Sequence, residues 1–144
     1  MPKNESYWLL KSEPETYSIH DLQRDGKTPW NGVRNFQARN FLREMKKGDI
    51  ALIYHSVKEK AVVGVGRVLT EAYPDPDSER KGDWVQVDIS FEKCLKTAVS
   101  LDRIKKDPTL RSLPLVTHSR LSVMPIPAAQ FHHIMGLAEG NTSQ

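Results

Sequence analysis

A strict alternation of apolar and polar side chains between Val85 and Phe91 constrains the fold more than any other feature of the sequence. Apolar residues occupy every second position, and Gln86, Asp88 and Ser90 lie between them. A period of two predicts a β-strand with one buried and one exposed face. Because strands of this kind belong to sheets with one solvated face, we expect a sheet that is antiparallel in part.

Shorter apolar runs and their flanking residues predict the other elements. Further strands are expected at residues 7–10, 50–54, 61–69 and 121–126, and Leu115-Val116 is interpreted as the start of another. Helices are expected at 19–24 after the N-cap Ser18, at 36–45 after the N-cap Asn35, in a short turn after Ser100, and from Pro127 to Leu137. Residues 29–32 are predicted to form a loop.

This order of elements indicates one α+β domain. Its core is expected at about residues 5–138, with a frayed tail at 139–144. The domain is predicted to contain a curved, barrel-like mixed sheet of five or six strands with peripheral helices.

Two glycines, Gly64 and Gly66, interrupt the strand expected at residues 61–69. Glycines two positions apart leave one face of a strand without side chains. The pattern predicts either a β-bulge or a place where another group approaches the backbone closely, and the sequence leaves both explanations open.

The composition is typical of one ordinary soluble domain. The 144 residues are 38% hydrophobic and 27% charged. No stretch approaches the ~18 consecutive apolar residues of a membrane span, and no apolar signal segment follows the N-terminus. The one cysteine, Cys94, excludes an internal disulfide and a cysteine-based zinc cluster, and is typical of a reducing compartment. We therefore expect a cytoplasmic protein without a membrane partner.

Positive charge is concentrated in the middle of the chain. The whole sequence has 21 basic and 18 acidic residues, whereas residues 27–67 have nine basic and three acidic residues, a net charge of +6. Such clustering is expected to attract phosphates, because electrostatics supplies most non-specific affinity for nucleic acids. The alternative is an ordinary solvated helix face. The candidate phosphate-binding residues are Arg34, Arg39, Arg43, Lys58 and Lys60.

No motif of a known catalytic or metal site is present. The signatures of phosphate-binding loops, nucleophile elbows and zinc deaminases are missing. The adjacent His132 and His133 cannot both face one ligand from a helix. We therefore expect no catalytic residue, no metal and no cofactor. One enzymatic alternative stays open, a hydrolase that would use Ser12 or Ser56 with His55.

Polar side chains follow several buried runs, at the points where strands are expected to end. Strand ends that converge on one rim form a pocket, and Trp30 adds an aromatic surface between two asparagines. An aromatic face with a few fixed hydrogen-bonding groups is what recognition of a base requires. The polar candidates are Lys11, Ser12, Glu13, Asn31, Asn35, His55, Ser56 and Arg120. The alternative explanations are that Trp30 is a core residue, that Asn35 is only an N-cap and that residues 12–14 form only a turn.

Five motifs, taken in order, resemble those of the EVE domain family. They are residues 8–14 (WLLKSEP), 30–35 (WNGVRN) with Ala38-Arg39, 54–56 (YHS), 72–75 (AYPD) and 120–123 (RLSV), and they cover nearly the whole chain. The resemblance implies a PUA-like fold, which is a small closed or nearly closed β-barrel with peripheral helices. It also implies kinship with YTH domains, which bind a methylated adenine in an aromatic cage, and a reader of modified bases rather than a catalyst.

The resemblance also implies roles for particular residues. Trp30 corresponds to the cage tryptophan, with Lys11, Ser12 and Asn35 beside it. Tyr54, His55 and Ser56 are implied to form another wall of the pocket. The second aromatic wall is assigned to Tyr73, with Trp84 as the weaker candidate, and Arg120 is implied to supply a charged donor. Met124 departs from the family pattern, in which a polar residue is expected at the pocket edge.

The sequence thus predicts a non-catalytic protein that binds nucleic acid carrying a modified base. The base would stack on Trp30, and the basic middle segment would hold the phosphates. A pocket for a free modified nucleoside is the remaining alternative. The sequence leaves open which modification is bound, whether DNA or RNA carries it, and the oligomeric state.

Overall fold

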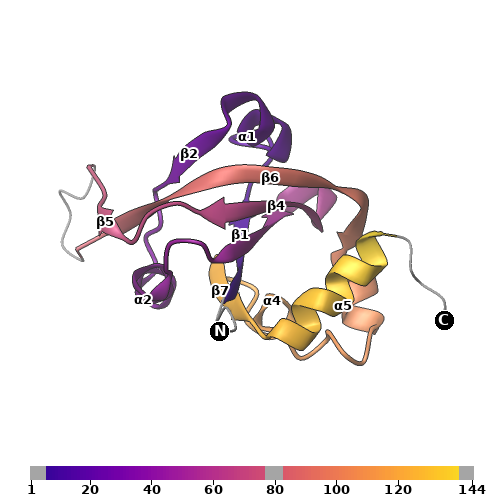
Figure 1. Ribbon diagram of the computed structural model, residues 1–144. Helices are drawn as coiled ribbons and strands as arrows, with labels where there is room; N and C mark the ends of the chain where they lie inside the picture. The colour runs from indigo at the N-terminus through magenta and orange to yellow at the C-terminus, as the bar shows by residue number, and fades with distance from the viewer. Residues whose placement is uncertain (1–5, 77–82, 140–144) are drawn as a thin grey trace, which may run out of the picture.

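The computed structural model describes residues 6–76 and 83–139, and in this part of the chain seven strands form one mixed sheet (Figure 1). The strands are β1 (Tyr7–Ser12), β2 (Lys27–Trp30), β3 (Ile50–His55), β4 (Ala61–Val68), β5 (Tyr73–Pro74), β6 (Val85–Ser100) and β7 (Val123–Ile126). The helices are α1 (Ile19–Asp25), α2 (Phe36–Glu44), α3 (Leu101–Lys106), α4 (Pro114–Thr117) and α5 (Ala128–Ala138), with a 3-10 turn η1 (Val57–Glu59). The predicted α+β class is confirmed.

The sheet follows the order β2-β6-β4-β3-β1-β7, and the two-residue strand β5 pairs with β6. β1 and β3 are parallel, and the other pairs are antiparallel. The two end strands of this order, β2 and β7, do not pair with each other in the described part of the chain, so the sheet does not close into a barrel. The expectation of five or six strands was wrong, because the strands β2 and β5 have only four and two residues and are too short for a periodic pattern.

The long strand β6 organises the sheet. It runs across the molecule in Figure 1, with α1 and β2 on one side and α5 on the other. The predicted alternation from Val85 to Phe91 forms its first half, where Val87 and Ile89 are fully buried. The strand continues beyond that pattern to Ser100, which is the N-cap of α3 as predicted. Its half-buried Cys94 lies in this second half.

Two residues on β4 explain why α1 and β6 come so close to this strand. A Cβ at Gly64 would lie 2.6 Å from Ile19 Cγ1, and a Cβ at Gly66 would lie 2.7 Å from Ile89 Cγ2. The β4–β6 register also shifts at both glycines, which marks bulges. Both explanations that the sequence left open therefore hold.

The predicted helix caps are confirmed. The side chain of Ser18 accepts a hydrogen bond from the Asp21 N–H, and Gly26 ends α1 with a φ of +83°. The side chain of Asn35 accepts a hydrogen bond from the Ala38 N–H at 2.9 Å and so begins α2. Asn35 is therefore the N-cap of α2, as predicted.

Two predicted elements were wrong in type. The loop expected at residues 29–32 is in part strand β2, since Pro29 is tolerated on an edge strand that needs no donor there. The strand expected at Leu115-Val116 is helix α4, because Pro114 occupies its first turn, where a missing N–H costs nothing. Pro127 is the N-cap of α5 rather than its first helical residue.

The last strand, β7, is an edge strand as its proline predicts. Pro125 lies opposite Trp8 of β1, and Met124 lies opposite Leu9. Met124 is fully buried, so at this departure from the family pattern the side chain is part of the hydrophobic core. In the described residues, no helix combines the length and apolar character that crossing a membrane requires.

We predict that replacing Gly64 by alanine destabilises the protein by about 1–3 kcal/mol, because the added methyl group overpacks against the buried Ile19. Gly136 in α5 is the matched control, since a Cβ there meets no atom within 4 Å. Gly136→Ala should stabilise by roughly 0.5–1 kcal/mol through helix propensity. Urea unfolding measures both effects, and a Gly64→Ala variant as stable as the parent would contradict the close approach.

Candidate functional site

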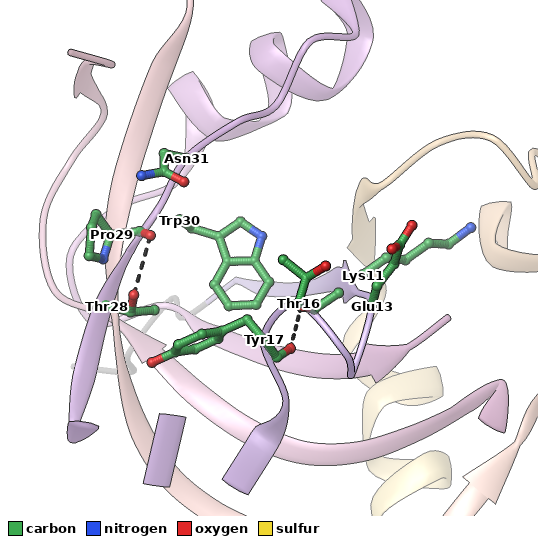
Figure 2. Close-up of a pocket in the computed structure, with 9 residues that line it drawn as sticks. Lys11, Glu13, Thr16, Tyr17, Thr28, Pro29, Trp30 and Asn31 are labelled. Atoms are coloured by element: carbon green, nitrogen blue, oxygen red, sulfur yellow. Dashed lines mark hydrogen bonds between the residues drawn. The ribbon is translucent and has the colours of Figure 1, made fainter. Parts of the chain in front are cut away.

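A cavity with polar and aromatic lining lies between β1 and β2 and has a volume of about 530 Å³. One side consists of the end of β1 and the loop after it, and the other side is β2 with the residue that follows (Figure 2). β2 is one end of the sheet order and β1 is next to the other end, so the cavity lies where the open sheet fails to close. We call it the seam pocket, lined by Lys11, Ser12, Glu13, Thr16, Tyr17, Thr28, Pro29, Trp30 and Asn31.

Two aromatic side chains face the seam pocket. In Figure 2 the Trp30 indole projects from β2 toward the loop before α1, and the ring of Tyr17 lies next to it. Trp30 is only 9% exposed, so it is both a core residue and part of the pocket lining. Burial, together with a 2.8 Å hydrogen bond from the hydroxyl to Asp25, raises the pKa of Tyr17, so this residue stays neutral.

Sequence reasoning missed Tyr17. It follows a short turn in which Glu13 O accepts hydrogen bonds from the N–H groups of Thr16 and Tyr17. The Ser12 hydroxyl then donates to Tyr17 O at 2.6 Å. A turn thus follows Ser12, the last residue of β1, and it brings Tyr17 back to the end of that strand. Ser12 and Glu13 line the seam pocket as well. Its signal in the sequence was an aromatic residue directly before the Ser18 cap.

Lys11 connects the seam pocket to a neighbouring hollow. Its Nζ donates a hydrogen bond to Ser119 O at 2.8 Å and lies 5.8 Å from the centre of the Tyr54 ring. Burial lowers the pKa of the Lys11 ammonium. We call the neighbouring space, about 280 Å³ in volume, the α2 hollow; it is lined by Asn35, Gln37, His118, Ser119, Arg120 and Leu121. The predicted site residues Asn35 and Arg120 therefore lie beside the seam pocket, outside its lining.

The wall expected from Tyr54, His55 and Ser56 does not line the seam pocket. Tyr54 is buried next to Lys11, and burial raises its pKa. His55 is buried and its Nε2 accepts a hydrogen bond from the Ile19 N–H at 3.0 Å, which places the ring proton of the neutral form on Nδ1, 3.4 Å from Glu59. The Ser56 N–H donates to Ser12 O at 2.9 Å. His55 and Ser56 therefore fix the backbone at the start of α1 and at the end of β1.

The aromatic residues proposed for the second wall also lie elsewhere. Tyr73 is on β5, and its hydroxyl donates to Asp88 at 2.5 Å, which raises the pKa of Tyr73. Trp84 is buried before β6 and stacks on Phe36, with ring centres 5.1 Å apart. Neither residue lines the seam pocket, where Tyr17 is the second aromatic side chain.

The loop after Trp30 is fixed by a buried carboxylate. Asp75 is only 2% exposed and accepts hydrogen bonds from the Gly32 N–H at 3.1 Å and from Arg34 at 3.2 Å. The motif at residues 72–75 therefore supports the segment that carries Trp30 and Asn31. It also means that the guanidinium of Arg34 stabilises the fold.

The other candidate phosphate-binding residues are divided between two elements. On α2, the guanidinium of Arg39 lies 5.0 Å from the centre of the Phe36 ring, and Arg43 donates to Asp83 O at 3.1 Å. Lys60 is exposed and lies between η1 and β4, whereas the side chain of Lys58 lies outside the described part of the structure. The charge cluster of the sequence thus becomes two separate groups.

The adjacent histidines of α5 have separate partners. His132 packs edge-on against Tyr7 and Phe131, and His133 Nε2 lies 2.7 Å from Asp107. Burial raises the pKa of Asp107, but hydrogen bonds from His133 and Thr109 outweigh this effect and lower it. Within residues 6–76 and 83–139, no group of three His, Cys, Asp or Glu side chains is arranged to hold a metal ion.

Comparison with known proteins identifies close relatives. The family model of the EVE domain matches residues 6–137. Thymocyte nuclear protein 1 of Rattus norvegicus is 39% identical over 171 residues, which cover 96% of this chain and 76% of the relative.

Solved structures give the same picture. The structure of human THYN1 protein in complex with DNA containing 5-methylcytosine superimposes with a TM-score of 0.86 at 34% identity, covering 94% of this chain and 98% of that one. The YTH domain of the Zygosaccharomyces rouxii MRB1 protein, in complex with N6-methyladenosine RNA, gives a TM-score of 0.59 at 18% identity over 96% of this chain and 90% of that one, which shows a shared fold.

We predict that Arg34→Ala destabilises the protein by about 1–3 kcal/mol, because it removes a charged partner from the buried Asp75. Arg43 of α2 is the control, since its exposed guanidinium contacts only a backbone carbonyl among the contacts described. Arg43→Ala should change stability by no more than about 0.5 kcal/mol. Thermal or urea unfolding compares the two, and equal effects would show that Arg34 has no special structural role.

Proposed function

Because the chain belongs to the EVE domain family, we propose that it is a non-catalytic reader that binds a modified base of DNA or RNA in the seam pocket. The observation that carries this proposal is the pairing of Trp30 and Tyr17 in one cavity at the open edge of the sheet. Relatives supply the ligand class, since human THYN1 protein is described in complex with DNA that contains 5-methylcytosine.

The seam pocket has the properties that binding of a base requires. Its volume of about 530 Å³ lies in the range of roughly 300–1,000 Å³ that is typical of small-ligand sites. Trp30 and Tyr17 offer aromatic surface for stacking, and polar groups of Ser12, Glu13 and Asn31 surround them. A base would enter by leaving its stack, either from a single strand or by flipping out of a duplex.

The side chains of the hydrolase alternative are used for structure. The lone pair on His55 Nε2 accepts the Ile19 N–H, and the Ser12 hydroxyl donates to Tyr17 O. A general base must be within hydrogen-bond reach of the proton that it removes, and no such pairing of His55 with Ser12 or Ser56 is among the hydrogen bonds of these side chains. This arrangement favours a reader over a hydrolase in the same pocket.

The free-nucleoside alternative makes a different prediction about affinity. A pocket that serves only a nucleoside would bind an oligonucleotide no more tightly than the isolated nucleoside. A reader gains affinity from the flanking phosphates, and this gain falls as the salt concentration rises. The cytoplasmic location expected from Cys94 remains a prediction alongside this function.

We predict selective binding to oligonucleotides with a modified base, measured by fluorescence anisotropy. The panel consists of matched single- and double-stranded DNA and RNA carrying one 5-methylcytosine, 5-hydroxymethylcytosine, N6-methyladenine or unmodified base. Trp30→Ala should lower the affinity for the preferred ligand by about tenfold or more, since loss of a stacking surface costs roughly 1–3 kcal/mol. Binding that ignores the modification in the parent protein would reject the reader hypothesis.

Tyr17 provides a matched pair of variants, which is needed because Trp30 also belongs to the core. Tyr17→Phe removes the hydrogen bond to Asp25 but keeps the ring, and should retain selective binding. Tyr17→Ala removes the ring and should weaken binding of the modified base by several-fold to tenfold. Equal affinities for the two variants would show that the ring of Tyr17 does not contact the base.

A further inference from the structure

The α2 hollow is separate from the seam pocket but is connected to it by one side chain. Lys11 lines the seam pocket, and its Nζ donates to the carbonyl of Ser119, which lines the α2 hollow. One lysine side chain therefore reaches from the lining of one space to the lining of the other. In a nucleotide, the base and its phosphate are likewise separated by a single sugar.

The chemistry of the α2 hollow differs from that of the seam pocket. Its lining combines one arginine, one histidine, two amides and a serine, and contains no carboxylate, whereas the seam pocket contains Glu13. Arg120 is exposed and forms no ion pair or side-chain hydrogen bond within the described part of the chain. A hollow with a cation and several donors, and without a carboxylate, favours an anion.

Two further features supply donors to the same space. Asn35 uses its Oδ1 to cap the Ala38 N–H, which leaves its amide nitrogen as a donor. His118 Nδ1 lies 2.7 Å from the hydroxyl of Thr117, so Nε2 is the other ring atom that can interact with a ligand. The first turn of α2 also begins here, and its N–H groups favour negative charge.

We propose that the α2 hollow binds a backbone phosphate of the nucleotide whose base occupies the seam pocket, with Arg120 as the principal cation. The proposal rests on the proposed function. It moves the specific phosphate contact away from Arg34, which is paired with Asp75, and from Arg39 and Arg43, which have partners on and near α2. The planar guanidinium of Arg120 suits two phosphate oxygens at once.

The test uses the full chain and single-stranded DNA with one 5-methylcytosine or one cytosine at the same position. Arg120→Gln should weaken binding of both oligonucleotides by the same factor of about tenfold and reduce the slope of log affinity against log salt by about one. Selectivity for 5-methylcytosine should be unchanged. Lys105→Gln, an exposed residue of α3 outside the linings of both spaces, is the matched charge control and should bind like the parent.

A second measurement locates the phosphate by calorimetry. The parent protein should bind the 3′- or the 5′-monophosphate of 5-methyl-2′-deoxycytidine about tenfold more tightly than the nucleoside, and Arg120→Gln should remove this difference. The inference is overturned if Arg120→Gln leaves both the salt slope and the gain from phosphate unchanged. If the parent protein binds the two oligonucleotides with equal affinity, the proposed function is rejected instead. Failure of the inference and failure of the proposed function are therefore distinguishable.

Discussion

The antiparallel pairing of β2 with the first half of β6 determines where a functional site can form. Trp30 lies opposite Val87 in this pairing, at one end of the sheet order, while β1 joins the sheet near the other end. Because the sheet does not close, β1 and β2 do not pair with each other by hydrogen bonds. The end of β1 and the side chain of Trp30 line a common cavity instead. The pocket is thus a consequence of sheet topology.

Most of the polar residues around this cavity fix backbone segments. Asp75 holds the segment after Trp30, Ser12 closes the turn that carries Tyr17, and His55 binds the first N–H of α1. The sequence motifs that contain these residues belong to the segments around the pocket, because each of these segments needs partners for its buried polar groups. A site prearranged in this way loses little conformational freedom when a base enters.

Much of the fold follows from local patterns, since β6 is evident from its alternation, α1 and α2 from their caps, and β7 from its proline. β2 was missed because four residues that include Pro29 carry no periodic signal, and its partner lies about 60 residues away along the chain. The same limit applies to the site. Trp30, Lys11 and Ser12 were found at strand ends. Tyr73 was misplaced because its position depends on the long-range pairing of β5 with β6, and Tyr17 was missed because the turn that carries it has no apolar periodicity.

The most direct test of the account is a proton–nitrogen NMR titration of the three indole N–H groups with single-stranded DNA containing 5-methylcytosine. The account predicts that the Trp30 resonance shifts on binding. The Trp8 indole, which donates to the buried Asp49 at 2.9 Å, should not shift. If the oligonucleotide binds while the Trp30 resonance stays in place, the modified base does not occupy the seam pocket and the central claim is wrong.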